Sequence, residues 1–223
     1  MTRPGRWVDP YAGIQGRRLF VAVPLPDTAV AAVAGIVDSV RAQPLPAGAH
    51  DVRWVRLDGL HLTLRFLGPT ATPQIEPTRS AVERAAEVAA PISAELGSAG
   101  VFPPAGRPRA LWIGVAVGGD ELAGLAAVVN RELAEAGWPI DERPFRAHLT
   151  VARADGVGAG RLVADRLITA IGDRRIDCAI DRLGLFESVT GGGPARYLPV
   201  FEAPLGAPGR DVGRDRGAAD RRP

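Results

Sequence analysis

The stretch HLTLRFLG at residues 61–68 shares its opening tripeptide with HLTVARA at residues 148–154. The chain contains three histidines, and two of them, His61 and His148, begin the same His-Leu-Thr sequence. Both stretches have the apolar and β-branched composition that favours strands. We therefore start from the hypothesis that these two strands are one repeated element, used once in each half of the chain.

The period of a strand decides which residues of each motif act together. Successive side chains point to opposite faces, so His61 and Thr63 share one face, and His148 and Thr150 do the same. The intervening Leu62 and its counterpart can then enter the core. Each motif presents an imidazole and a hydroxyl about 7 Å apart, and the two pairs could face each other across a groove.

Two imidazoles and two hydroxyls in this arrangement suit the chemistry of a phosphodiester. Histidine has a pKa of about 6.5, so one neutral ring can accept a proton from water while a protonated ring donates one to the leaving oxygen. Threonine hydroxyls can donate hydrogen bonds to the non-bridging oxygens, where charge builds up in the transition state. This chemistry needs no metal, and no carboxylate stands at ligand spacing beside either motif.

The rest of the chain predicts interleaved helices and strands. Helices are predicted over 28–43, 73–90, 120–137 and 159–171, and strands over 18–25, 51–56, 61–68, 92–103, 110–117, 144–154, 175–188 and 196–205. Asp27 is expected to cap the first helix, and Asp58 and Gly59 to form a turn. Because short turns join antiparallel strands, the pattern predicts an α+β fold. We expect two pseudo-twofold-related lobes, with antiparallel sheets lining a central groove and helices packed outside.

Composition sets limits on the class of protein. All 27 basic residues are arginine and balance 25 acidic residues, a composition that permits an anionic partner but does not require one. Cys178 is the only cysteine, so no disulfide within the chain is possible, and we expect a cytoplasmic protein. No secretory signal or membrane span is expected. We predict a flexible leader at 1–17, one domain at 18–205 and a disordered tail at 206–223.

The motifs and their flanks resemble a known family. HLTLRFLG and FRAHLTVAR are similar to the paired motifs of the 2H phosphoesterase superfamily, and most similar to those of the RNA 2′,3′-cyclic phosphodiesterases, once called 2′-5′ RNA ligases. RLFVAVPLP, WVRLDGLHLTLRFLG and RYLPVFEAPL extend the resemblance over residues 18–205. It implies a bilobal fold around a groove. It also implies hydrolysis of a terminal 2′,3′-cyclic phosphate of RNA to a 2′-phosphate, without a metal or cofactor.

The resemblance also implies roles for the motif residues. His61 and His148 become the catalytic pair, and Thr63 and Thr150 the phosphate-binding residues. Arg153 stands where the family often has an arginine near the phosphate. Regular alternation would turn Arg153 away from the histidines, so this role requires a bulge or the end of the strand.

Several expectations concern the surroundings of the motifs. We assign His148 as the general base and His61 as the general acid, although the sequence does not decide between the two assignments. Arg65 is expected to share a face with His61 and to reach phosphate or ribose, and Phe66 is expected to lie in the core. His50, in a loop rich in Pro, Gly and Ala, is expected to be exposed.

Other functions remain open at this stage. The same fold could join tRNA halves through a 2′-5′ bond, or hydrolyse cyclic phosphates of small nucleotides. A third possibility is an RNA-end binding module that holds the phosphate without reacting. For each function that acts on RNA, the expected partner is an RNA with a 2′,3′-cyclic phosphate end. The protein is expected to be a monomer.

Overall fold

A computed structural model describes residues 15–154, 158–191 and 193–206. Its strands form two antiparallel sheets, which we call the first sheet (order β3-β1-β8-β9) and the second sheet (order β2-β6-β5-β4-β7). The strands are β1 (Arg17–Pro24), β2 (Arg53–Trp54), β3 (His61–Thr70), β4 (Ile92–Phe102), β5 (Ala110–Val117), β6 (His148–Arg153), β7 (Ile176–Ile180), β8 (Arg182–Val189) and β9 (Arg196–Pro204). The helices are α1 (Asp27–Arg41), α2 (Thr72–Glu87), α3 (Gly119–Glu135) and α4 (Gly160–Ile171), with a short 3-10 turn η1 (Leu57–Gly59). The predicted α+β fold with antiparallel sheets is confirmed.

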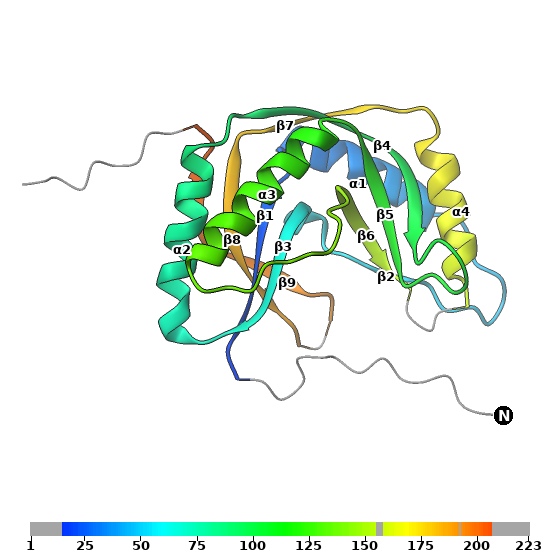
Figure 1. The fold of residues 1–223 in the computed structure, drawn as a ribbon. Helices are drawn as coiled ribbons and strands as arrows, with labels where there is room; N and C mark the ends of the chain where they lie inside the picture. The colour runs from blue at the N-terminus through cyan, green and yellow to red at the C-terminus, as the bar shows by residue number, and fades with distance from the viewer. Residues whose placement is uncertain (1–14, 155–157, 192, 207–223) are drawn as a thin grey trace, which may run out of the picture.

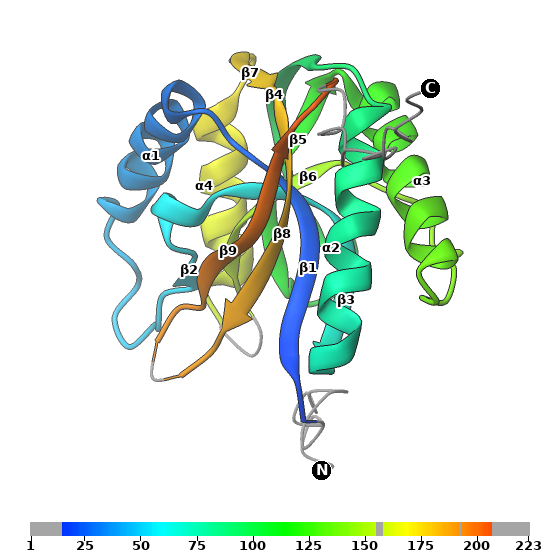
Figure 2. The ribbon, with the colours of Figure 1, turned by 90° about the vertical axis from the view of Figure 1, so that its left-hand side faces the viewer.

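Two pairs of helices cover the two sheets on the outside of the molecule (Figures 1 and 2). Helices α2 and α3 contact each other and the first sheet, whereas α1 and α4 contact each other and the second sheet. The connections are exchanged: α1 follows β1 of the first sheet but packs on the second, and α3 follows β5 of the second sheet but packs on the first. Buried side chains from both sheets therefore belong to one continuous apolar cluster.

The two sheets repeat the same local order. Strand β3 lies beside β1, and β6 lies beside β5, so each His-Leu-Thr motif occupies the equivalent strand of its own sheet. Strands β3 and β6 also contact each other. The two predicted lobes therefore meet along the two strands that carry the motifs.

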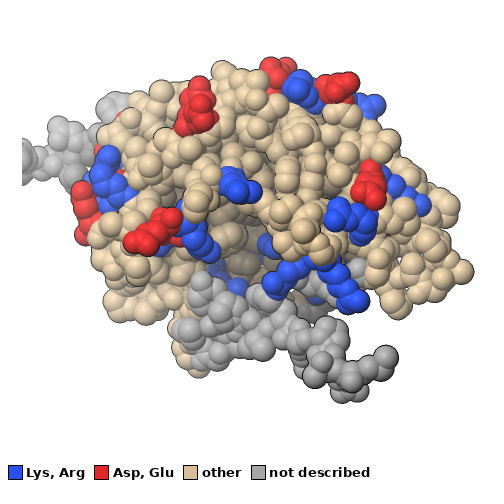
Figure 3. Space-filling view, turned by 45° about the vertical axis from the view of Figure 1, so that its right-hand side comes forward, with Lys and Arg blue, Asp and Glu red and all other residues tan. Residues whose placement is uncertain are grey.

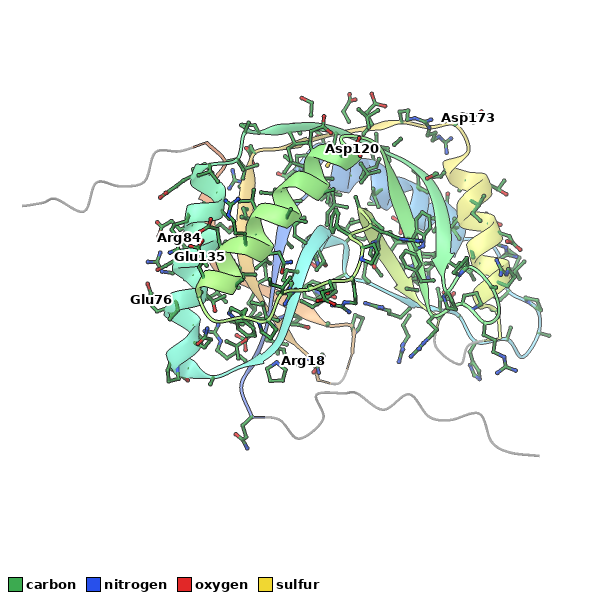
Figure 4. The ribbon with its side chains drawn as sticks, viewed as in Figure 1. Arg18, Glu76, Arg84, Asp120, Glu135 and Asp173 are labelled. Carbon is green, nitrogen blue, oxygen red and sulfur yellow. The ribbon has the colours of Figure 1, made fainter. Side chains whose placement is uncertain are left out.

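Charged side chains join the two helices that cover the first sheet. Glu132 of α3 is buried, and its carboxylate accepts hydrogen bonds from Arg84 of α2 at 3.0 Å and from Arg131 at 3.1 Å. Figure 4 labels Arg84 on α2 and Glu135 at the end of α3, and the two helices contact each other. This contact ties α3 to α2 near the end of α3.

The predicted strand 175–188 is two strands that belong to different sheets. The chain passes at Asp181 from β7, in the second sheet, to β8, in the first. The residues that enter the main core are even-numbered up to Ile180 but odd-numbered in β8, where they are Leu183 and Leu185. This change of phase reverses the face that meets the core, which a single regular strand cannot do.

The structure refines the predicted turn at Asp58 and Gly59 and corrects the predicted cap of the first helix. The strand 51–56 does not pair with the motif strand that follows it, because β2 pairs with β6 while β3 pairs with β1. The turn at Asp58 and Gly59 is part of η1, which carries the chain from one sheet to the other. Asp27 does not cap α1, since Pro26 occupies the N-cap position without a side-chain hydrogen bond. Asp27 instead lies in the first turn, where its charge favours the helix dipole.

The leader at 1–17 and the tail at 206–223 lie, apart from residues 15–17 and 206, outside the described residues. Within the described ranges, no helix is both long and apolar enough to cross a membrane. Cys178 is buried as a free thiol, and burial raises its pKa to about 11.

Candidate active site

The two predicted histidines begin the two strands that meet between the lobes. His61 is the first residue of β3, His148 is the first residue of β6, and both side chains are half-buried. The charge of His148 contributes to lowering the pKa of His61, so the two rings are within electrostatic reach of each other. Figure 3 shows a hollow near the middle of one face, with arginines gathered around it and acidic side chains farther out. His50 is exposed, as expected.

Each imidazole ring is oriented by an equivalent hydrogen bond between its Nδ1 and a backbone carbonyl. Nδ1 of His61 lies 2.7 Å from the carbonyl oxygen of Gly59, and Nδ1 of His148 lies 2.7 Å from the carbonyl oxygen of Arg146. A carbonyl can only accept, so Nδ1 must carry the proton in each ring. Each ring therefore keeps Nε2 for proton exchange, and the acceptor is the carbonyl two residues earlier in both halves.

A β-bulge interrupts the motif strand of the first sheet. Thr63 pairs with Ala22 and Arg65 pairs with Val21, so Leu64 is the extra residue. Opposed residues of an antiparallel pair point to the same face, and Val21 belongs to the main core. The bulge therefore turns Arg65 away from the face of Thr63.

The motif strand of the second sheet has the equivalent bulge. Thr150 pairs with Trp112 and Ala152 pairs with Leu111, so Val151 is the extra residue. This is the third residue after the histidine, as in β3. The bulge returns Arg153 to the face of Thr150, which is the condition that the predicted role of Arg153 required.

Arg65 does not share a face with His61, and that prediction was wrong. Its Nη1 donates to Asn130 Oδ1 at 3.0 Å and lies 3.3 Å from a carboxylate oxygen of Asp141, and its Nη2 donates to the carbonyl of Pro139. The side chain is only 10% exposed. The sequence prediction assumed unbroken alternation, which the bulge at position 64 removes.

Phe66 is not a core residue, because the same bulge carries it to the face of His61. It pairs with Phe20, its ring centroid lies 6.1 Å from that of Phe20, and its side chain is 55% exposed. Phe66 and Arg153 each stand five residues after their histidine. The two halves of the site thus present an aromatic ring on one side and a cation on the other at equivalent positions.

Aromatic rings that the sequence prediction missed surround His61. Phe20 lies 4.8 Å from the His61 ring, Tyr197 lies 4.7 Å away edge-on, and Phe186 lies 6.5 Å away. A side chain at Gly59 would meet the Tyr197 ring at 3.0 Å, so the close approach of Tyr197 depends on this glycine. These residues lie on β1, β8 and β9, and only the sheet order brings them to the histidine. On the other side of the site, the ring of Phe102 lies edge-on to His148 at 5.0 Å.

Burial and positive charge lower the pKa of both histidines. At His61, burial has the largest effect, the Gly59 carbonyl opposes it, and the charges of Arg153 and His148 lower the pKa further. At His148, burial again dominates, the Arg146 carbonyl opposes it, and Arg153 lowers the pKa. Burial raises the pKa of Tyr197, against an opposing effect of Arg153. Arg153 therefore lowers the pKa of all three groups, which indicates that its charge lies near them.

The polar groups of the two motifs are hydrogen-bond donors. Within residues 15–154, 158–191 and 193–206, no three His, Cys, Asp or Glu side chains gather into a cluster that could bind a metal. The groups assembled around the two motifs are imidazoles, hydroxyls and a guanidinium. Such groups donate hydrogen bonds to oxyanions.

A family model described as the 2′-5′ RNA ligase superfamily matches residues 26–192. The chain belongs to this superfamily. The match spans both His-Leu-Thr motifs, and it confirms the family resemblance that the motifs predicted.

Two relatives within this superfamily show the extent of the similarity. The RNA 2′,3′-cyclic phosphodiesterase of Archaeoglobus fulgidus is 36% identical over 137 residues, which cover 61% of this chain and 72% of the relative. The protein of the same name from Aeropyrum pernix is 31% identical over 164 residues, covering 71% and 89%.

Solved structures of similar fold agree. The crystal structure of E. coli LigT complexed with 3′-AMP has a TM-score of 0.63 and 26% identity, covering 86% of this chain and 99% of that one. A protein of Thermus thermophilus has a TM-score of 0.66 at 24% identity, covering 85% and 98%, and supports the fold alone.

Nitrogen NMR of histidine-labelled protein tests the geometry of the site directly. We expect His61 and His148 to titrate below the ordinary value of about 6.5 and, when neutral, to carry the proton on Nδ1. Because the pKa values of both rings are lowered on folding, the fold should lose stability as the pH falls below about 6.5. A titration midpoint above about 6.5 at either residue, or a neutral ring protonated on Nε2, would contradict this description.

Proposed function

We propose that this superfamily member hydrolyses the terminal 2′,3′-cyclic phosphate of RNA to a 2′-phosphomonoester by a metal-independent, two-histidine mechanism. The observation that carries the proposal is the pair of imidazoles, one from each sheet, with identical Nδ1 hydrogen bonds. Because each Nδ1 is engaged in its hydrogen bond, the two Nε2 atoms are left for acid and base catalysis. The names of the relatives from Archaeoglobus fulgidus and Aeropyrum pernix support the choice of substrate.

In the proposed step, water attacks phosphorus and the bond from phosphorus to the 3′ oxygen breaks. One histidine takes a proton from the attacking water through Nε2, and the other gives a proton to the departing 3′ oxygen. The ring opens to a free 3′ hydroxyl and a 2′-phosphate. The pair of histidines ends with its proton exchanged between the two rings, and solvent restores the starting state.

Hydrogen-bond donors next to the histidines can hold the phosphate during this step. Thr63 and Thr150 lie on the same faces as their histidines, and their hydroxyls are proposed to donate to the non-bridging oxygens. The charge of Arg153 lowers the pKa of both histidines, which supports a role for Arg153 in neutralising the phosphate between them. Phe66 offers an exposed ring on the His61 side, on which an RNA base can stack.

The division of roles between the two histidines stays a prediction, with His148 as the base and His61 as the acid. The assignment requires a protonated His61 and a neutral His148 when the substrate is bound, whereas burial and the charge of Arg153 lower the pKa of both rings in the free protein. Ligation, the reverse reaction, would exchange the two roles.

Replacing the 3′ oxygen of the substrate with sulfur distinguishes the two assignments. A thiolate leaves without protonation far more readily than an alkoxide, so this substrate depends less on the acid. We expect the fold-loss of activity in His61→Ala to be at least about ten times smaller on the sulfur substrate than on the oxygen substrate. His148→Ala should lose the same activity on both, and the opposite pattern would make His61 the base.

A product assay in EDTA tests the proposed function as a whole. Wild-type protein should convert an RNA with a 2′,3′-cyclic phosphate end to the 2′-phosphate despite the chelator. His61→Ala and His148→Ala should each lose about 10²- to 10⁴-fold in rate, because each removes one proton-transferring group. His50→Ala is the matched control and should keep full activity.

Each other outcome of this assay selects one of the remaining functions. Full activity in either site variant would exclude the two-histidine mechanism. Binding of the cyclic-phosphate end without conversion would favour an RNA-end binding module. A preference for mononucleotide cyclic phosphates would favour a small-nucleotide phosphodiesterase, and joined tRNA halves would favour ligation. A cytoplasmic monomer is part of the proposal, and the free, buried thiol of Cys178 is consistent with a reducing compartment.

A further inference from the structure

The segment that leads to His148 is fastened to the opposite lobe. Residues 136–147 contain no helix or strand, and in Figure 1 they run from the end of α3 across β3 to the start of β6. Side chains of α2 hold the beginning of this segment. Gln74 donates to the carbonyl of Ala136 at 2.7 Å, and the indole N–H of Trp138 donates to the Thr78 hydroxyl at 2.9 Å.

Three polar side chains, which we call the Arg65 clamp, hold the middle of the segment: Arg65, Asn130 and Asp141. Arg65 donates to Asn130 Oδ1 and to the Pro139 carbonyl, and it forms an ion pair with Asp141. Asn130 bonds both backbone groups of Asp141, with its Oδ1 accepting at 3.1 Å and its Nδ2 donating at 3.3 Å. Arg65 and Asp141 are only 10% and 22% exposed, so solvent screens their interaction weakly.

The far end of the segment orients the catalytic ring. Phe145 and Ala147 pack against the main core, and the carbonyl of Arg146 between them accepts the Nδ1 hydrogen bond of His148. The position of this carbonyl therefore depends on the path of the chain from Asp141 onward. Arg65, four residues after His61 on β3, fixes the start of that path.

We propose that Arg65 is a positioning residue for His148, acting through the clamp on the segment 136–147. The clamp ties the strand of the first histidine to the segment that orients the second, and so keeps the two Nε2 atoms in register across the phosphate. Its effect on turnover rests on the proposed function, but its effect on the His148 ring does not. This role replaces the substrate contact that the sequence predicted for Arg65.

The test compares Arg65→Met with Arg143→Met. Both substitutions remove a guanidinium that binds the Asp141 carboxylate. Arg143, however, is 77% exposed and lies in the same segment as Asp141, so its hydrogen bonds do not connect this segment to β3. We expect Arg65→Met to lower kcat about tenfold with KM within about twofold, since small displacements of a catalytic group reduce the rate steeply. Arg65→Lys should recover part of kcat, and Arg143→Met should behave as wild type.

Nitrogen NMR of the three histidines provides a readout independent of activity. In Arg65→Met the neutral His148 ring should shift from the Nδ1–H tautomer toward a mixture, while the His61 and His50 signals stay in place. Asp141→Asn keeps the shape of the clamp but removes the negative charge of the carboxylate. It should shift the tautomer of His148 in the same direction. This variant decides the question if Arg65→Met does not fold.

Two results would overturn the proposal. One is a folded Arg65→Met or Asp141→Asn protein with wild-type kcat and an unchanged His148 signal. The other is a rise in KM at unchanged kcat, which would make Arg65 a substrate contact after all. If wild-type protein had no activity on cyclic-phosphate RNA, the proposed function would fail, but the NMR comparison would still decide whether the clamp orients His148.

Discussion

The contact between β3 and β6 is the constraint on which the site depends. Each strand begins with a histidine and belongs to a different sheet, and neither sheet alone contains both rings. The exchanged helices make this contact stable, because each lobe is covered by a helix whose preceding strand lies in the other lobe. Separating the lobes would expose the apolar cluster that they share, at a cost that grows with the area uncovered.

The repeat gives the site its symmetry, and differences at equivalent positions give it a direction. Both histidines use Nδ1 in the same way, and both strands bulge at the third residue after the histidine. After the bulges the halves diverge, with Phe66 on one side and Arg153 on the other. A symmetric groove could accept a nucleotide in two orientations. An aromatic ring on one side and a cation on the other would favour one of them.

The sequence predicted the elements of this fold well, because helices and strands follow local periodicity. From a spacing of two, it also predicted that each histidine shares a face with its threonine, as the strand registers show. It failed where the outcome depends on pairing between distant strands. The bulges arise from the register against β1 and β5, so Arg65 and Phe66 were assigned to the wrong faces. Tyr197 reaches His61 only through the sheet order, for which no local pattern exists.

In the proposed mechanism, two histidines act on one phosphorus from opposite sides, and water attacks in line with the departing oxygen. Such a single displacement inverts the configuration at phosphorus. The most direct measurement is hydrolysis of one diastereomer of an RNA-terminal 2′,3′-cyclic phosphorothioate in ¹⁸O-labelled water, followed by phosphorus NMR of the product after stereospecific ring closure. The proposed mechanism predicts inversion. Retention would mean two successive displacements through a covalent phosphoenzyme, and would contradict it.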